Sequence, residues 1–195
     1  SEYARKGAEL FAGLPRHEAE LACRYACNEL NGFPGWIGEL AQAQPAACAA
    51  VFGEAVLGEW AAAATEEFAG DVASRLRYAE EPLCDLVKEV VRTGLYGSDP
   101  PNTRMLDHVL HLAVRAEAYT RAEWAQLSAS KVKPYSPDTD PFMLWIGMWL
   151  QSDLAGALAA LESLLGSLKP PEQDALVMRS LRVIGSRSRL GQSVP

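Results

Sequence analysis

The sequence has few of the residues that favour β-sheets. Among its 195 residues there are 3 isoleucines and 5 threonines, whereas alanine occurs 31 times. β-branched side chains favour strands, and alanine loses no side-chain entropy in a helix. No stretch alternates apolar and polar residues as a half-buried strand would. The composition therefore predicts an all-α fold.

The sequence also lacks the short motifs of common enzyme and metal sites. There is no GxxxxGK[ST] for a nucleotide and no GxSxG for a serine nucleophile. His17 and Glu18 begin an HExxH pattern, but Leu21 occupies the position of the second histidine. We therefore expect no catalytic residue set, no cofactor and no bound metal, and hence a protein that is not an enzyme.

Cysteine is scarce, and its spacing fits no known metal site or disulfide framework. The four cysteines form no CxxC pair, and no further Cys/His pair completes a zinc set. Cys23 and Cys27 would lie one helical turn apart, about 6 Å between Cβ atoms, which is too far for an ordinary disulfide. Buried free thiols in a reducing, cytoplasmic compartment are the prediction for all four: Cys23, Cys27, Cys48 and Cys84.

Long apolar runs and a positive net charge are missing as well. The longest apolar run, Phe142 to Leu150, is about half of what a membrane-spanning helix needs. The net charge of −7 opposes general binding to nucleic acid phosphates. We therefore expect neither a membrane nor a nucleic acid as partner. Residues 175–195 carry four arginines and no acid, which suits the C-terminus of a helix or a contact with an acidic surface.

The apolar periodicity is close to 3.6 residues throughout and predicts about eleven short helices. Pairs of them recur about every 35–40 residues, which is typical of stacked helical hairpins, although an irregular α-helical globule would also fit. Alanine-rich stretches at 46–50 and 61–64 are expected where helices approach closely. The predicted helices are 2–13, 15–31, 34–43, 45–62, 65–78, 81–95, 103–117, 120–130, 141–151, 153–167 and 170–187.

One segment resembles a known class of repeat. The stretch from Leu21 to Trp60 reads as a helix, a turn at Asn31 and Gly32, a short helix, Pro45 and a second helix. It resembles one degenerate HEAT-type unit, and its NELNGFPGW segment is similar to helical-repeat regions of large bacterial NACHT-type NTPases. The resemblance implies an α-solenoid of antiparallel helix pairs, and we expect residues 1–195 to form one helical-repeat domain, a fragment of a longer protein.

The predicted helix 103–117 carries a cluster of basic side chains. Helical spacing places Arg104, His108, His111 and Arg115 within one strip. Two histidines at i and i+3 could share a metal, but the flanking arginines oppose a divalent ion. Two interpretations remain. The strip is either a solvated surface or a surface that meets an acidic partner. Histidines with ordinary pKa values near 6.5 would add positive charge to such a strip on mild acidification.

Two tryptophans give the second candidate site. Trp145 and Trp149 lie four residues apart within the apolar run, and a long loop at 131–141 precedes them. A helix that is apolar all round is either central in the core or covered by something else. These tryptophans therefore belong to the core or to a partner-binding patch.

The predicted function is binding rather than catalysis. We expect a non-catalytic scaffold or sensor segment whose partner is a protein or another domain of the same longer chain. The alternative is an all-α regulatory domain with a small ligand in a pocket lined by tryptophan. The expected contact residues are Arg104, His108, His111, Arg115, Trp145 and Trp149.

Overall fold

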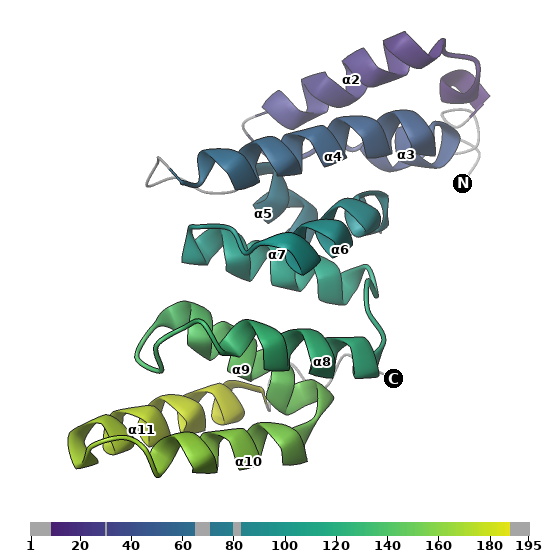
Figure 1. Ribbon diagram of the computed structural model, residues 1–195. Helices are drawn as coiled ribbons and strands as arrows, with labels where there is room; N and C mark the ends of the chain where they lie inside the picture. Colours follow the sequence, from purple (N-terminus) through teal and green to yellow (C-terminus); the bar gives the residue numbers. More distant parts are fainter. Residues whose placement is uncertain (1–8, 30, 65–70, 80–82, 188–195) are drawn as a thin grey trace. The chain divides into compact units, whose positions relative to one another are not determined.

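The computed structural model describes residues 9–29, 31–64, 71–79 and 83–187, with side chains described as far as residue 182. Every regular element in this part of the chain is a helix, and none of these residues lies in a strand (Figure 1). The all-α prediction is confirmed. The chain groups into two compact units, residues 1–118 and 119–195. The prediction of one continuous repeat domain stays a prediction, and the two units are described separately.

The helices begin and end close to the predicted positions. In unit 1 they are α2 (Arg16–Asn28), α3 (Ile37–Ala43), α4 (Pro45–Ala62), α5 (Asp71–Tyr78), the 3₁₀ helix η1 (Leu83–Val87), α6 (Lys88–Gly97) and α7 (Thr103–Arg115). In unit 2 they are α8 (Arg121–Val132), α9 (Asp140–Ser152), α10 (Leu154–Leu165) and α11 (Pro170–Arg187). Most of the predicted helix 2–13 lies outside the described residues, as do residue 30 of the predicted helix 15–31, residues 65–70 of 65–78 and residues 81–82 of 81–95.

One predicted helix is divided in two. The sequence predicted a single helix over 81–95, but η1 ends at Val87 and α6 begins at Lys88. Val87 has φ −106° and ψ 5°, outside the α-helical region. The tighter 3₁₀ turn buries the side chains of Leu83, Cys84 and Val87 together against the rest of unit 1. Packing therefore overrides the helical periodicity at this point.

In unit 1 the helices follow one another in space in the order of the sequence. Helices α2 and α3 pack on α4, and the other face of α4 contacts α5 and η1. Helix α7 then packs on α5, α6 and η1. The side chains of Phe52 and Val56 in α4 and of Met105 and Leu112 in α7 are fully buried between these layers. Burial of such apolar side chains is the main source of stability for the unit.

Unit 2 is organised around α9, because α8, α10 and α11 all contact it (Figure 1). The apolar run predicted from the sequence occupies this central helix. Phe142, Ile146 and Leu150 form a core with Leu161 of α10 and Leu176 of α11. A helix with three neighbours needs apolar side chains on most of its surface, which explains why the run has no polar face.

Long polar side chains of one helix or loop cap the C-terminal end of another helix in the same unit. The last carbonyl groups of a helix have no partner within that helix, so donors from a neighbour can satisfy them. In unit 1 Gln44 donates to the carbonyl group of Leu14, Arg75 to that of Glu29 and Arg115 to that of Ala79. In unit 2 Arg121 donates to the carbonyl group of Ser152, and Gln173 donates to that of Leu165.

Candidate functional site

The predicted basic strip lies on α7, but it is not one exposed surface. Asn102 caps the helix by accepting hydrogen bonds from the backbone amides of Arg104 and Met105. Arg104 is exposed. His108, by contrast, is only 5% exposed, because α5 packs over this side of α7. The prediction of a contiguous accessible strip is therefore wrong at His108.

Arg77 of α5 organises the buried side of the strip. Its Nη1 atom donates to Asp107 Oδ2 at 2.5 Å and lies 3.2 Å from His108 Nδ1. Its Nη2 atom lies 3.2 Å from His111 Nε2. One guanidinium thus meets a carboxylate and two imidazoles, all of them from α7.

One of these contacts restricts the proton position of His108. An arginine can only donate hydrogen bonds, so His108 Nδ1, which faces Arg77, accepts one and the ring proton lies on Nε2. His108 Nε2 is buried, and among the described residues it has no hydrogen-bond partner. His111 Nδ1 lies 2.8 Å from the backbone carbonyl oxygen of Asp107.

The electrostatics follow from this geometry. Burial alone would raise the pKa of Asp107, but hydrogen bonds and charges from His111 and Arg77 outweigh it and lower that pKa to about 2. Burial lowers the pKa of His108, and the positive charge of Arg77 lowers it further, against the opposing effect of Asp107. His108 therefore does not gain charge on mild acidification as readily as the sequence suggested.

Arg115 at the other end of α7 has a capping role. Its guanidinium donates to the backbone carbonyls of Leu76, Arg77 and Ala79 at 3.4, 2.5 and 2.9 Å. It therefore holds the C-terminal end of α5. Of the four strip residues, Arg104 and Arg115 are exposed, and Arg115 is engaged at the end of α5.

His108 and His111 belong to one network of contacts with Arg77 and Asp107. Asp107 is engaged by Arg77 through one carboxylate oxygen and lies 3.3 Å from His111 Nδ1 through the other. Within the described parts of the chain, no three His, Cys, Asp or Glu side chains are arranged to hold a metal ion. The network joins α5 to α7, and we assign it a structural role.

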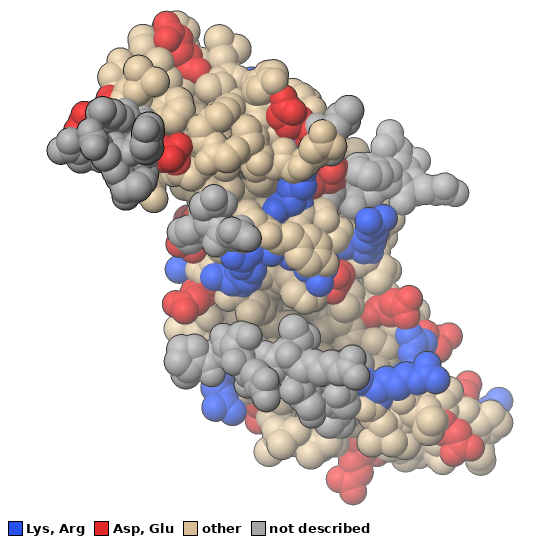
Figure 2. All heavy atoms as spheres, turned by 180° about the vertical axis from the view of Figure 1, so that it is seen from behind, with Lys and Arg blue, Asp and Glu red and all other residues tan. Residues whose placement is uncertain are grey.

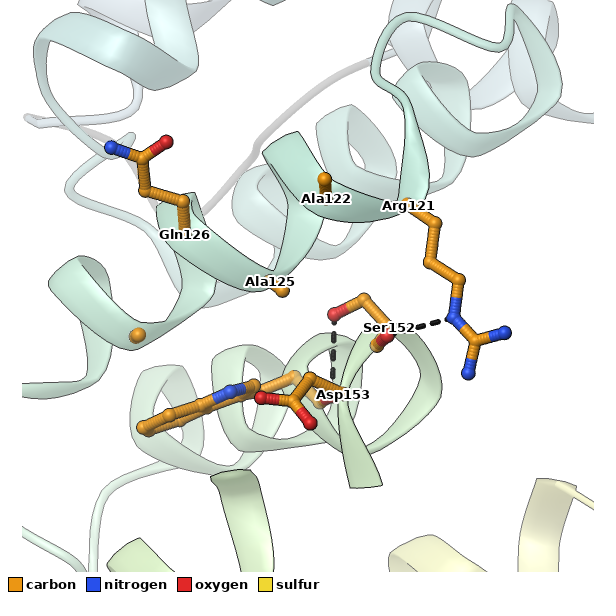
Figure 3. A pocket seen from close by; sticks show the side chains of 8 residues that line it. Arg121, Ala122, Ala125, Gln126, Ser152 and Asp153 are labelled. Atoms are coloured by element: carbon orange, nitrogen blue, oxygen red, sulfur yellow. Dashed lines mark hydrogen bonds between the residues drawn. The ribbon is translucent and has the colours of Figure 1, made fainter. Parts of the chain in front are cut away.

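Unit 2 contains an open groove between α8 and α9 (Figure 3). It has a volume of about 690 Å³ and opens to solvent. Three alanines are among the lining residues on the α8 side, and the half-buried Trp149 lines the α9 side. The lining residues are Arg121, Ala122, Ala125, Gln126 and Ala129 of α8, with Trp149, Ser152 and Asp153 from the end of α9.

The polar residues of the groove are held in fixed positions. Arg121 Nε donates to the backbone carbonyl of Ser152 at 2.8 Å, and its guanidinium extends beyond α9 (Figure 3). Asp153 caps α10 by accepting a hydrogen bond from the backbone amide of Gly156 at 3.0 Å. The groove therefore combines an aromatic surface, a positive charge at one end and a carboxylate beside it.

The two predicted tryptophans occupy different environments. Trp145 is 0% exposed, so of its two predicted environments, the core or a partner-binding patch, its burial agrees with the core. Trp149, one turn later, is half-buried and lines the groove. Because residues four apart share one helix face, the difference lies along the helix axis: Trp149 is nearer the end of α9, where Ser152 and Asp153 also line the groove.

Sequence reasoning missed Arg77 and Arg121. Each arginine supplies the positive charge of its site. Its partners lie about 30 residues away in sequence, so no short-range sequence pattern predicts the contact. On the face seen in Figure 2, basic side chains lie among acidic ones in each unit, without forming one continuous basic surface.

Comparison with known proteins adds no relative. No protein-family model, curated protein or solved structure matches this chain. The resemblance to HEAT-type units of NACHT-type NTPases therefore stays a prediction. Within the described residues, none of the helices is both long and apolar enough to cross a membrane.

Proposed function

We propose that this chain is a non-catalytic α-helical repeat scaffold of stacked antiparallel pairs, and that the groove between α8 and α9 binds an extended segment of a protein partner. The single observation that carries the proposal is that the half-buried Trp149 and the guanidinium-bearing Arg121 line one groove that is open to solvent. Tryptophan and arginine contribute most often to the energetic centres of protein interfaces. The prediction of a cytoplasmic scaffold fits this role.

The chemistry of the groove indicates what the segment carries. An aliphatic or aromatic side chain would pack on Trp149 in the space left by Ala122, Ala125 and Ala129. An acidic side chain next to it would pair with Arg121. Unit 2 has eight Lys and Arg against seven Asp and Glu, whereas unit 1 has ten against eighteen. An acidic segment is therefore repelled less by unit 2 than by unit 1.

The alternative ligand is a small molecule in the same groove. The volume of the groove, about 690 Å³, lies within the range of small-molecule sites. However, such sites bury most of their ligand, and this groove is largely open to solvent. An open groove leaves room for the rest of a longer chain outside it, so we favour a peptide segment.

Selection of random peptides displayed on phage against the full chain tests the proposal. Selected peptides should place an apolar residue next to an acidic one. Ala125→Leu places a larger side chain in the groove that Trp149 lines, and Arg121→Glu reverses the charge of the arginine in the groove. Each should weaken binding of a selected synthetic peptide at least about tenfold, as fluorescence anisotropy would show.

Two matched variants separate this effect from general changes in unit 2. Ala159→Leu adds the same side chain at an exposed position of α10, and Lys133→Glu reverses an exposed charge after α8. Both should leave the affinity unchanged. If Ala125→Leu binds the peptides as tightly as the unmodified chain, the groove is not their site. If Ala125→Leu abolishes binding of fragment-sized small molecules but not binding of the selected peptides, the small-molecule alternative is correct.

A further inference from the structure

Three of the four cysteines gather between α2 and α4 in unit 1. Cys23 and Cys27 are on α2 and Cys48 is on α4, and the two helices pack together. The thiol of Cys23 interacts with the thiols of both Cys27 and Cys48. All three are free thiols, as the sequence predicted, although their grouping across two helices was not foreseen.

The three thiols differ in their access to solvent. Cys23 and Cys48 are 0% exposed, whereas Cys27, near the C-terminal end of α2, is half-buried. A small oxidant in solution therefore reaches Cys27 first. Cys84 of η1 is also buried but lies outside this cluster, so it provides an internal comparison.

The surroundings of Cys27 favour its thiolate. Arg75 of α5 donates hydrogen bonds to the backbone carbonyls of Cys27 and Glu29, which places its positive charge at this end of α2. The hydrogen bond with the Cys23 thiol lowers the pKa of Cys27 most, and the charges of Arg75 and Arg24 lower it further, whereas burial and the Glu59 carboxylate oppose them. Burial, by contrast, raises the pKa of Cys84. The thiolate is the reactive form of cysteine.

Helix geometry decides where a stable disulfide can form. Cys23 and Cys27 are one turn apart on the same helix, about 6 Å between Cβ atoms, whereas disulfides need about 3.8 Å. A bond between them would strain the end of α2. Cys23 and Cys48 are on different helices, so a bond between them leaves both helices intact.

We propose that Cys27 is a hydroperoxide-sensitive modification site whose oxidation ends in a disulfide between Cys23 and Cys48. The Cys27 thiolate attacks one peroxide oxygen: the S–O bond forms, the O–O bond breaks, and the other oxygen takes a proton and leaves as an alcohol or water. The sulfur is oxidised to a sulfenic acid, and the peroxide is reduced.

Two exchange steps complete the reaction. The Cys23 sulfur attacks the sulfenic sulfur of Cys27, so that an S–S bond forms and hydroxide leaves as water with the thiol proton. The Cys48 thiol then attacks Cys23, its proton is lost, and Cys27 leaves as a thiolate that can be reprotonated. The net reaction converts two thiols and one hydroperoxide into one disulfide, one alcohol and one water.

Mass spectrometry of the full chain treated with hydrogen peroxide tests this proposal. Cleavage after Arg24, Glu29 and Glu39 places Cys23, Cys27 and Cys48 on separate peptides. Dimedone should label Cys27 at early times, at least about tenfold faster than Cys84, because Cys27 is half-buried with a lowered pKa whereas Cys84 is buried with a raised pKa. At late times the peptides of Cys23 and Cys48 should be found linked to each other.

Variants identify the role of each cysteine. Cys27→Ser should slow formation of the Cys23–Cys48 bond at least about tenfold, whereas Cys84→Ser should leave its rate unchanged. Cys48→Ala should stop the reaction at Cys27 sulfenic acid or its bond to Cys23. Equal labelling of Cys27 and Cys84 would overturn the assignment of Cys27. Higher oxidation states of Cys27 without any Cys23–Cys48 link would overturn the disulfide.

Discussion

The Arg77 guanidinium donates a 2.5 Å hydrogen bond to the Asp107 carboxylate and thereby joins α5 to α7. Both side chains are largely shielded from water, with 16% and 32% of their surfaces exposed. A charged pair that is partly removed from solvent and also bonded to histidines contributes more than an ordinary surface ion pair.

Asp107→Asn should lower the unfolding free energy of unit 1 by about 1–2 kcal/mol at pH 7. The pKa of Asp107 is lowered from 3.8 to about 2, so its stabilising effect is complete above about pH 4 and is lost as the pH falls through 2. Urea unfolding at pH 7 and pH 2 would therefore show a difference between variant and unmodified chain that shrinks in acid. Glu89→Gln, at an exposed carboxylate of α6, should show no such difference.

His108→Leu should reduce the loss of stability on mild acidification. The pKa of His108 is lowered in the folded state, so its neutral form is favoured and its stability contribution is complete above about pH 6.5. As the pH falls through the lowered pKa, protonation places a positive charge against Arg77. The midpoint of thermal unfolding should fall less between pH 7 and pH 5 in His108→Leu than in the unmodified chain. His17→Gln, a variant at the exposed His17, should behave like the unmodified chain. An equal fall of the unfolding midpoint between pH 7 and pH 5 in His108→Leu, His17→Gln and the unmodified chain would contradict the prediction.

Arg115→Ala should destabilise unit 1 by about 1–2 kcal/mol, because three carbonyl groups at the end of α5 lose their donor. Arg104→Ala removes an exposed arginine from the same helix and should change stability by less than about 0.5 kcal/mol. Chemical unfolding of the two variants measures the contrast. Similar losses in both would show that Arg115 is not a helix cap.

Gly94→Ala should destabilise unit 1 by roughly 1–3 kcal/mol, because a Cβ atom at residue 94 of α6 would lie 2.6 Å from the indole of Trp60 in α4. Gly58→Ala, in α4, meets no atom within 4 Å and should stabilise the chain by about 0.5–1 kcal/mol. Thermal unfolding should therefore move in opposite directions for the two substitutions. A gain in both would mean that Trp60 moves aside without cost.

The helical fold was predictable because its causes are local. Periodicity, prolines at the first turns and the Asn102 cap act within a few residues, and the helix boundaries agree closely with them. The alanine-rich segments were predicted less well. Ala47 and Ala63 are buried as expected, but Ala46, Ala50 and Ala61 are exposed. Alanine favours a helix on either face, so its frequency predicts the helix without showing which side is covered.

By itself the sequence determined an all-α chain, the positions of most helices and the presence of an apolar helix at residues 142–150. Only the tertiary structure decided that His108 is buried beneath Arg77, that Trp145 is in the core while Trp149 lines a groove, and that Cys23, Cys27 and Cys48 meet. Helix formation depends on neighbours in sequence, whereas burial, pKa and reactivity depend on which helix packs against which face. Partners about 30 residues apart, such as Arg77 and Asp107, become neighbours only through that packing.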